Sequence, residues 1–209
     1  MTRAALIFAF GALVGSVACG GSLPETHYYA LPSEAPQPRT GDGPALAIET
    51  LDAARPYDDD RMVYRVDPYR LDFYEYHHWA ASPGSLVADY LASAFARSGR
   101  FRSVARGPEA RGALAISGRV LALEELDATP TRWIGHVAVQ LVATDRATGE
   151  VVWTAQLDER VAMPTRSPDG LVRAVGVGLS RIAARAAPTI AAIEVSKRAP
   201  ATQARADSL

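Results

Sequence analysis

The chain has 209 residues, with 22 Lys and Arg against 23 Asp and Glu, a formal net charge of −1 at pH 7 and a single cysteine. This near-neutral balance argues against nucleic acid as a partner, because such partners call for a basic face. A single cysteine excludes an internal disulfide and a cysteine-based metal site, so the core must hold the fold. With 48% hydrophobic residues, the composition suits one domain with a sizeable core.

The first 18 residues follow the pattern of a secretory signal peptide. Arg3 precedes an apolar run, Ala4 to Val14, which is far shorter than the ~20 residues that a membrane-spanning helix needs. Small residues follow, and then Cys19. This order resembles a bacterial lipobox, with cleavage after Ala18 and a diacylglycerol attached to the Cys19 sulfur. The alternatives are an ordinary cleaved signal peptide and an uncleaved N-terminal helix.

Lipidation of Cys19 would hold the mature protein at a membrane surface. Each buried methylene contributes ~0.8 kcal/mol, and two acyl chains bind stably where one binds only marginally. Removal of residues 1–18 deletes one base and no acid, which moves the formal charge from −1 to −2. Gly20 rather than an aspartate follows the cysteine; by analogy with Gram-negative lipoprotein sorting, this favours the outer membrane, with the domain facing the periplasm. Residues 19–26 would form the lipidated tether.

The first half of the mature chain is predicted to be mostly strand. His27–Leu31 reads as a first strand and is followed by a loop rich in Pro and Gly. Apolar residues alternate in Ala45–Leu51, which predicts a second strand. Met62–Val66 and Tyr69–Trp79 are predicted to form a hairpin around Asp67–Pro68.

A helix is predicted next. Ser82 is a suitable N-cap, and Pro83 occupies the first helical position, where its missing N–H costs nothing. Apolar residues then recur at helical spacing as far as Phe95, and Ser98–Gly99 ends the helix.

The second half repeats the order of strands followed by a helix. In Leu114–Ala122, the residues Leu114, Ile116, Gly118, Val120 and Ala122 are predicted to share one face. Trp133–Thr144 and Val151–Ala162 are predicted to pair as an antiparallel hairpin. Pro168–Ala187 is predicted to be a helix that ends or weakens at Pro188.

The element order predicts an α+β fold, with an antiparallel or mixed sheet and two main helices packed on one of its faces. Residues 27–195 would form a single domain. The polar, small-residue-rich segment 196–209 would be a disordered tail.

No residue pattern predicts a catalytic, cofactor-binding or metal site. His77 and His78 are adjacent on a predicted strand, so their side chains leave on opposite faces and cannot share an ion. Asp58–Asp60 lacks the ligand spacing of a calcium loop and is interpreted as a solvated turn that pairs with neighbouring arginines. Gly176–Ser180 does not follow a strand, so its glycines indicate close helix packing rather than a dinucleotide fingerprint.

The region between the second strand and the first helix is unusually rich in aromatic residues. Such residues are favoured at interfaces because they combine apolar area with a hydrogen-bonding tip. The alternative is that they pack the core. A free edge of the first hairpin could also accept a strand from a partner or from a second copy, which would give a homo-oligomer. The candidate partner-interface residues are Tyr57, Tyr64, Tyr74, Tyr76 and Trp79.

Several segments, taken in order, resemble the ABC-type transport auxiliary lipoprotein family. These are the lipobox cysteine, "YYAL", "RPYDDDRMVYR", "YHHWAASPGSLVADYLASAF" and "DRATGEVVW". The resemblance implies a non-enzymatic docking subunit, anchored in the outer membrane, of a system that moves lipids or hydrophobic compounds. Its implied partners are a mammalian-cell-entry (MCE) domain protein and an ABC permease and ATPase complex. The alternatives are an anchored periplasmic hydrolase and a purely structural envelope lipoprotein.

Overall fold

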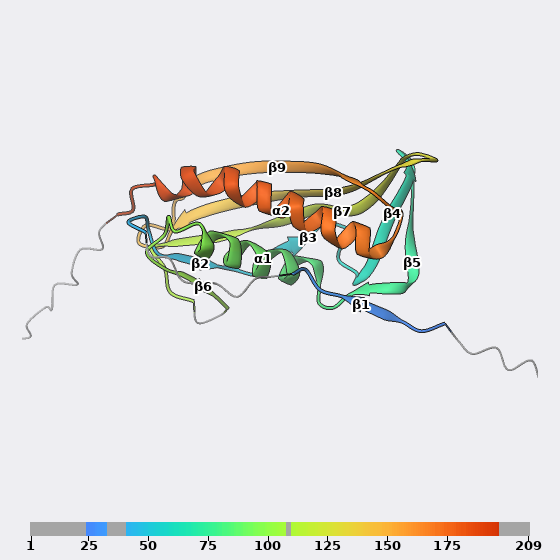
Figure 1. Cartoon of the computed structure of the whole chain (residues 1–209). Helices are drawn as coiled ribbons and strands as arrows, with labels where there is room; N and C mark the ends of the chain where they lie inside the picture. The colour runs from blue at the N-terminus through green and yellow to red at the C-terminus, as the bar shows by residue number, and fades with distance from the viewer. Residues whose placement is uncertain (1–23, 33–40, 108–109, 197–209) are drawn as a thin grey trace, which may run out of the picture.

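The computed structural model describes residues 24–32, 41–107 and 110–196 (Figure 1). The predicted signal peptide, the cleavage position after Ala18, the lipidation residue Cys19 and the predicted tail lie outside the described residues, apart from Ser196. Most of the Pro-rich loop also lies outside them.

The sheet is organised around one long strand, β7 (Leu114–Thr129). Along one edge β7 pairs antiparallel with β8 (Arg132–Asp145), which in turn pairs antiparallel with β9 (Val151–Met163). The hairpin predicted for these last two strands is therefore confirmed. Within the described ranges, β9 pairs with β8 alone and forms one edge of the sheet.

Three short or medium strands follow one another along the other edge of β7. These are β2 (Leu46–Ile48), β3 (Asp52–Ala53) and β4 (Arg61–Asp67), and all three run parallel to β7. The predicted first hairpin is confirmed, since β4 pairs antiparallel with β5 (Arg70–Trp79).

Two further parallel pairings complete the sheet. β1 (His27–Tyr29) runs beside the end of β5, and β6 (Val104–Arg106) runs beside β2. The sheet has nine strands and is mixed, which confirms the predicted α+β fold.

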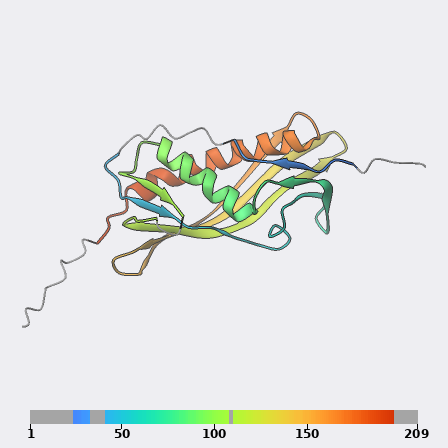
Figure 2. The ribbon, with the colours of Figure 1, turned by 90° about the horizontal axis from the view of Figure 1, so that it is seen from below.

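Both helices cover the same face of the sheet (Figures 1 and 2). The helix α1 (Pro83–Arg97) starts with proline, as predicted, although Ser82 makes no side-chain capping bond. In α2 (Pro168–Ala191), the Ser167 side chain caps the helix by accepting a hydrogen bond from the Gly170 N–H. No helix in the described ranges is long and apolar enough to cross a membrane.

Close contact between α2 and the sheet depends on small residues. A Cβ on Gly178 would lie 2.6 Å from Cγ1 of Val137, and one on Gly135 would lie 2.5 Å from Cβ of Ala174. The interpretation of the glycines in Gly176–Ser180 as a helix-packing feature is therefore confirmed for Gly178, whereas a Cβ on Gly176 would meet no atom within 4 Å. Between the helices and the sheet lies one apolar core, whose largest fully buried members include Trp79, Phe95, Phe101, Met62, Leu91 and Leu171.

Two predictions require correction. The pairing of β7 with β8 shifts register between Val120 and Ala122, so Ala122 leaves the face that it was predicted to share with Val120. The helix α2 also continues past Pro188 to Ala191. The fully buried Ile190 holds this last turn against the core, and the C-cap N–H of Ala192 bonds the Pro188 carbonyl.

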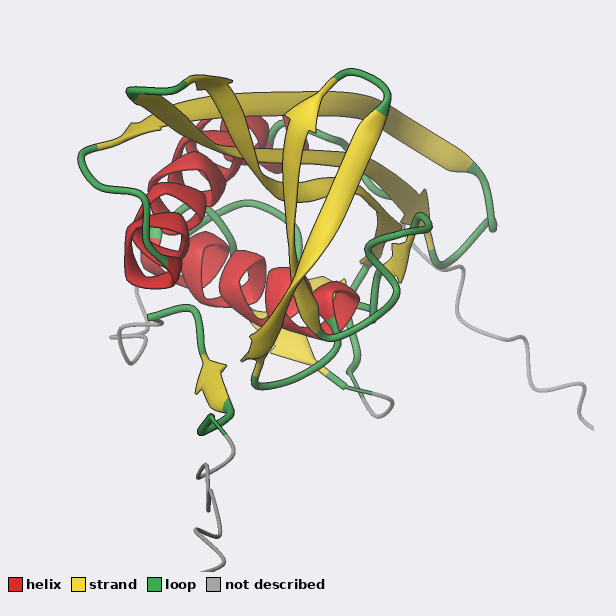
Figure 3. Ribbon diagram, turned by 90° about the vertical axis from the view of Figure 1, so that its right-hand side faces the viewer, coloured by secondary structure: helices red, strands yellow, loops and turns green. Residues whose placement is uncertain are grey.

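The two ends of the molecule differ. At one end, which we call the hairpin end, lie the β4–β5 turn, the β7–β8 turn and the start of α2; Figure 3 views the molecule from this side. At the other end, the distal end, lie the β8–β9 turn and the end of α2.

Candidate functional site

A groove of about 540 Å³ opens at the hairpin end. Its apolar wall comes from the β4–β5 turn and from Leu126 and Ile134 on β7 and β8. Polar and charged residues complete the lining, among them Arg65, Asp67, Glu124, Asp127, His136 and Arg160.

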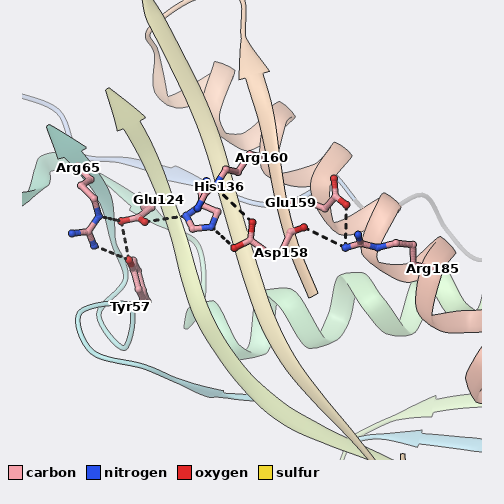
Figure 4. A network of polar contacts seen from close by, with 8 residues as sticks. All are labelled: Tyr57, Arg65, Glu124, His136, Asp158, Glu159, Arg160 and Arg185. Atoms are coloured by element: carbon pink, nitrogen blue, oxygen red, sulfur yellow. Dashed lines mark hydrogen bonds and ion pairs between the residues drawn. The ribbon is translucent and has the colours of Figure 1, made fainter. Parts of the chain in front are cut away.

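A network of charged side chains forms the floor of this groove (Figure 4). Its centre is Glu124 on β7, which is only 3% exposed. Its Oε2 accepts hydrogen bonds from Tyr57 Oη at 2.8 Å and from Arg65 Nε at 3.0 Å. Its Oε1 lies 3.1 Å from His136 Nδ1, and His136 Nε2 lies 2.9 Å from Asp158 Oδ2. The network thus joins β4, β7, β8 and β9 with the loop before β4.

The partners of Glu124 determine its charge. Burial alone would raise the pKa of Glu124, but hydrogen bonds from His136 and Tyr57 and the charge of Arg65 bring it below its ordinary value. Burial opposes the charged form of His136 as well, yet Glu124 and Asp158 raise the pKa of its imidazole. Burial and the neighbouring carboxylate raise the pKa of Tyr57 to about 12, so its phenol stays a donor. The floor therefore favours an imidazolium between two carboxylates.

This arrangement is suited to holding strands together and presenting a polar floor. Both ring nitrogens of His136 face carboxylates, so neither is free to take a proton from a hydroxyl or thiol nucleophile. In the described part of the chain, no group of three or more His, Cys, Asp and Glu side chains could hold a metal ion.

A second polar cluster lies on the helix-covered face of the same strand. Glu125 is fully buried; its Oε2 accepts a hydrogen bond from Tyr74 Oη and its Oε1 accepts one from Arg166 Nε, both at 3.0 Å. Arg166 also bonds Asp127 Oδ2 at 2.7 Å. Burial and Asp127 nevertheless raise the pKa of Glu125, and burial with the adjacent carboxylate raises the pKa of Tyr74.

The five aromatic residues singled out in the sequence are spread over several environments. Tyr57 and Trp79 lie in the core, with 5% and 1% exposure. Tyr64 and Tyr74 are half-buried and lie together, with ring centroids 5.0 Å apart, and the Arg166 guanidinium lies 5.6 Å from the Tyr64 ring. Tyr76 is half-buried and is not part of this cluster.

The charged residues of the groove floor were not predicted from the sequence. One signal was available, because Glu124 and Glu125 interrupt an apolar run, and neighbouring strand positions face opposite sides. The Asp58–Asp60 turn does pair with arginines as predicted, since Arg61 bonds Asp59 at 2.9 Å and Arg55 lies 3.4 Å from Asp58. His78 adds a contact with Asp60 at 3.1 Å.

Solved structures share this fold at low sequence identity. Protein XCC0632 from Xanthomonas campestris matches with a TM-score of 0.64 and 18% identity, over 79% of this chain and 93% of that one. The hypothetical protein CT253 from Chlamydia trachomatis matches with a TM-score of 0.51 and 8% identity, over 74% of this chain and 99% of that one. No curated protein matches the sequence significantly.

The family comparison covers most of the domain. Residues 29–187, from β1 to the last turns of α2, match the model for the ABC-type transport auxiliary lipoprotein component. The chain therefore belongs to the ABC-type transport auxiliary lipoprotein family.

Proposed function

We propose that this protein is the membrane-anchored, non-catalytic docking subunit of an ABC transport system that includes an MCE-domain protein. The family match over residues 29–187 is the observation that carries the proposal. The anchor would be a diacylglycerol on Cys19, in the outer membrane, with the domain in the periplasm. The sequence context of Cys19 and the Gly20 that follows it support this placement.

The anchor would keep the domain close to the lipid. Only residues 20–23 separate Cys19 from the first described residue, so an extended tether spans at most ~18 Å. The tether enters the domain at β1, which pairs with the end of β5. The subunit would thus offer the transporter a fixed point on the membrane.

We place the contact with the transporter partner at the groove of the hairpin end. The groove is preformed, has an apolar wall, and is bordered by the β4–β5 turn. In that turn, Asp67 Oδ1 accepts hydrogen bonds from the N–H groups of Tyr69 and Arg70, at 2.8 and 2.9 Å. The turn is therefore ordered, and it presents Tyr69 with 97% of its surface exposed. An exposed tyrosine beside a groove is a suitable anchor for a protein partner.

Substitution of Cys19 tests the proposed membrane anchor. Cys19→Ala should move the protein out of the membrane fraction, and a strain carrying only this variant should lose transport. Full transport by the released protein would contradict the anchoring role. Mass spectrometry of the native protein reads acylation directly, and an unacylated N-terminus would contradict it too.

Affinity capture tests the docking site. The native protein, extracted in detergent, should retain an MCE-domain protein and the permease and ATPase. Tyr69→Asp should reduce that recovery without lowering Tm, because the side chain is exposed. Tyr28→Asp is the matched control, since Tyr28 is another exposed tyrosine, 66% accessible, on β1. Equal recovery with both variants would contradict the assignment of the groove.

A further inference from the structure

Two acids on β7 converge on one guanidinium at the hairpin end. Glu125 and Asp127 are two positions apart on the strand, so their side chains leave on the same face. Arg166 Nε bonds Glu125 Oε1 at 3.0 Å, and Arg166 Nη2 bonds Asp127 Oδ2 at 2.7 Å. These two nitrogens form the fork that usually holds both oxygens of one carboxylate. Here the fork holds one oxygen from each acid, which brings the two carboxyl groups side by side.

This acid pair is one hydrogen-bond donor short. Three of its four carboxyl oxygens accept a hydrogen bond, two from Arg166 and one, on Glu125 Oε2, from the Tyr74 hydroxyl. The fourth oxygen, Asp127 Oδ1, is buried and has no partner in the described structure. A buried polar atom without a partner is rare and costly. One proton held between the two carboxyl groups would supply the missing donor and leave a single negative charge facing Arg166.

Arg166 is the one cation bonded to the acid pair among the described residues. From β5 the pair meets the Tyr74 phenol, and from β4 the Tyr64 ring lies 5.6 Å from the Arg166 guanidinium. On β8, uncharged residues are paired with both acids. Beyond these groups, the His77 ring packs against Tyr74, and Asp169 in the first turn of α2 acts on His77 through its charge. No described neighbour bonded to the pair therefore balances its second negative charge.

We propose that Glu125 and Asp127 share one proton, and that this proton closes a latch between the β7–β8 turn and the loop before α2. The latch is the contact of Asp127, which lines the groove, with Arg166, which lies between β9 and α2. When the proton leaves, the two carboxylates repel each other, and Asp127 moves because its side chain is 15% exposed and that of Glu125 is 0% exposed. The β7–β8 pairing shifts register directly after Asp127, so the turn loosens there and the groove wall changes shape.

The direction of titration agrees with this geometry. Burial and Asp127 raise the pKa of Glu125, although the hydrogen bonds from Tyr74 and Arg166 oppose the rise. The latch is therefore complete below the ordinary carboxyl value of 4.5 and is lost as the pH rises through the folded value. Its effect on docking rests on the proposed function, since the groove is the proposed contact with the transporter. The shared proton itself needs no partner.

Carboxyl NMR titration of the full chain in detergent tests the shared proton. Asp127→Asn removes the second acid and leaves Tyr74 and Arg166 in place, so the pKa of Glu125 should fall by about one pH unit or more. Asp89→Asn is the matched control, because it removes a carboxylate that is 61% exposed on α1. The control should leave the pKa of Glu125 unchanged. An unchanged pKa in Asp127→Asn, or an equal fall in both variants, would overturn the proposal.

Amide hydrogen exchange tests the latch. In the parent chain, protection of the β7–β8 turn, corrected for the intrinsic effect of pH on exchange, should fall between pH 4.5 and the folded pKa of Glu125. The fall should reach at most about tenfold per pH unit, because one proton is released. Glu125→Gln replaces the shared proton with an amide donor of similar shape, so its protection should stay high over the same range.

Two outcomes of the exchange experiment would overturn the latch. One is protection in the parent chain that stays constant while Glu125 titrates. The other is a Glu125→Gln variant that loses protection as the parent does. Neither this experiment nor the NMR titration includes a transporter component, so their failure would leave the proposed docking role unaffected.

Discussion

Glu124 and Glu125 are neighbours on β7 and are both almost completely buried, yet they lie in opposite electrostatic environments. Glu124, on the groove face, meets Arg65, the imidazole of His136 and the phenol of Tyr57. Glu125, on the helix face, meets Arg166 and Tyr74 but shares its surroundings with a second acid, Asp127. The pKa falls for Glu124 and rises for Glu125.

The comparison shows that burial alone does not decide whether a carboxyl group ionises. Desolvation raises the pKa of both carboxyl groups. For Glu124 the hydrogen bonds and the positive charge of its partners outweigh desolvation and lower its pKa, whereas for Glu125 they do not. On the helix face, acceptors exceed donors, since the buried Asp127 Oδ1 has no hydrogen-bond partner in the described structure. The groove face is the more fully paired of the two.

The largest expected effect is the removal of the Glu124 carboxylate. Glu124→Ala leaves His136 and Arg65 without their shared partner in a buried site, and we expect the free energy of unfolding to fall by ~3–5 kcal/mol. Glu125→Gln is the comparison, because it retains the shape and an acceptor for Arg166; we expect a change within ~1 kcal/mol. Urea unfolding measures both. Equal losses of unfolding free energy in the two variants would contradict the proposed difference between the groove face and the helix face.

Tyr57 and Tyr74 allow the two faces to be compared through a single hydrogen bond each, to Glu124 and to Glu125. Tyr57→Phe removes a donor to a carboxylate whose pKa is lowered and should cost ~1.5–3 kcal/mol of unfolding free energy, whereas Tyr74→Phe removes a donor to a carboxyl group whose pKa is raised and should cost ~0.5–1.5 kcal/mol. Thermal unfolding of the two variants provides the measurement. The reverse order of losses would contradict the opposite directions of the two pKa shifts.

The strand pattern of the sequence is sufficient to predict the sheet hairpins but not the charge clusters. Alternation predicts Trp133–Thr144 and Val151–Ala162 as a hairpin because both strands carry their own period-two signal. The parallel contacts of β2, β3 and β4 with β7 are long-range, and no local pattern specifies them. Local patterns do not predict the groove for the same reason, because Arg65, Glu124 and His136 come together only when these strands pair.

The bulge in β7 shows a second limit. Alternation counted from Leu114 places Ala122 with the helix-facing residues, but the extra residue near Leu121 exchanges the faces beyond it. With the strand continued without a bulge, Glu124 would face the helices and Glu125 the groove. A single irregular residue thus decides which glutamate meets His136.

The pH dependence of the free energy of unfolding should show the contribution of His136. The pKa of its imidazole is raised in the folded chain, so its contribution to stability is complete below the unfolded value of 6.5 and is lost as the pH rises through the folded value. We expect the free energy of unfolding to fall over this interval by at most ~1.4 kcal/mol per pH unit for this group. His136→Gln should flatten the profile there. An unchanged slope in the variant would show that another group titrates.

The smallest expected effect comes from the arginine of the helix face. Arg166 is 43% exposed, so its ion pairs with Glu125 and Asp127 are partly screened, and we expect Arg166→Gln to cost about 1 kcal/mol or less. Glu125 can respond to the loss by taking up a proton, which its raised pKa already favours. On the groove face, Arg65→Gln should cost more, because Glu124 remains ionised and loses a counter-charge at 24% exposure. Carboxyl NMR titration separates the two cases: Arg166→Gln should raise the pKa of Glu125 further, and an unchanged pKa would mean that Arg166 does not act on this carboxyl group.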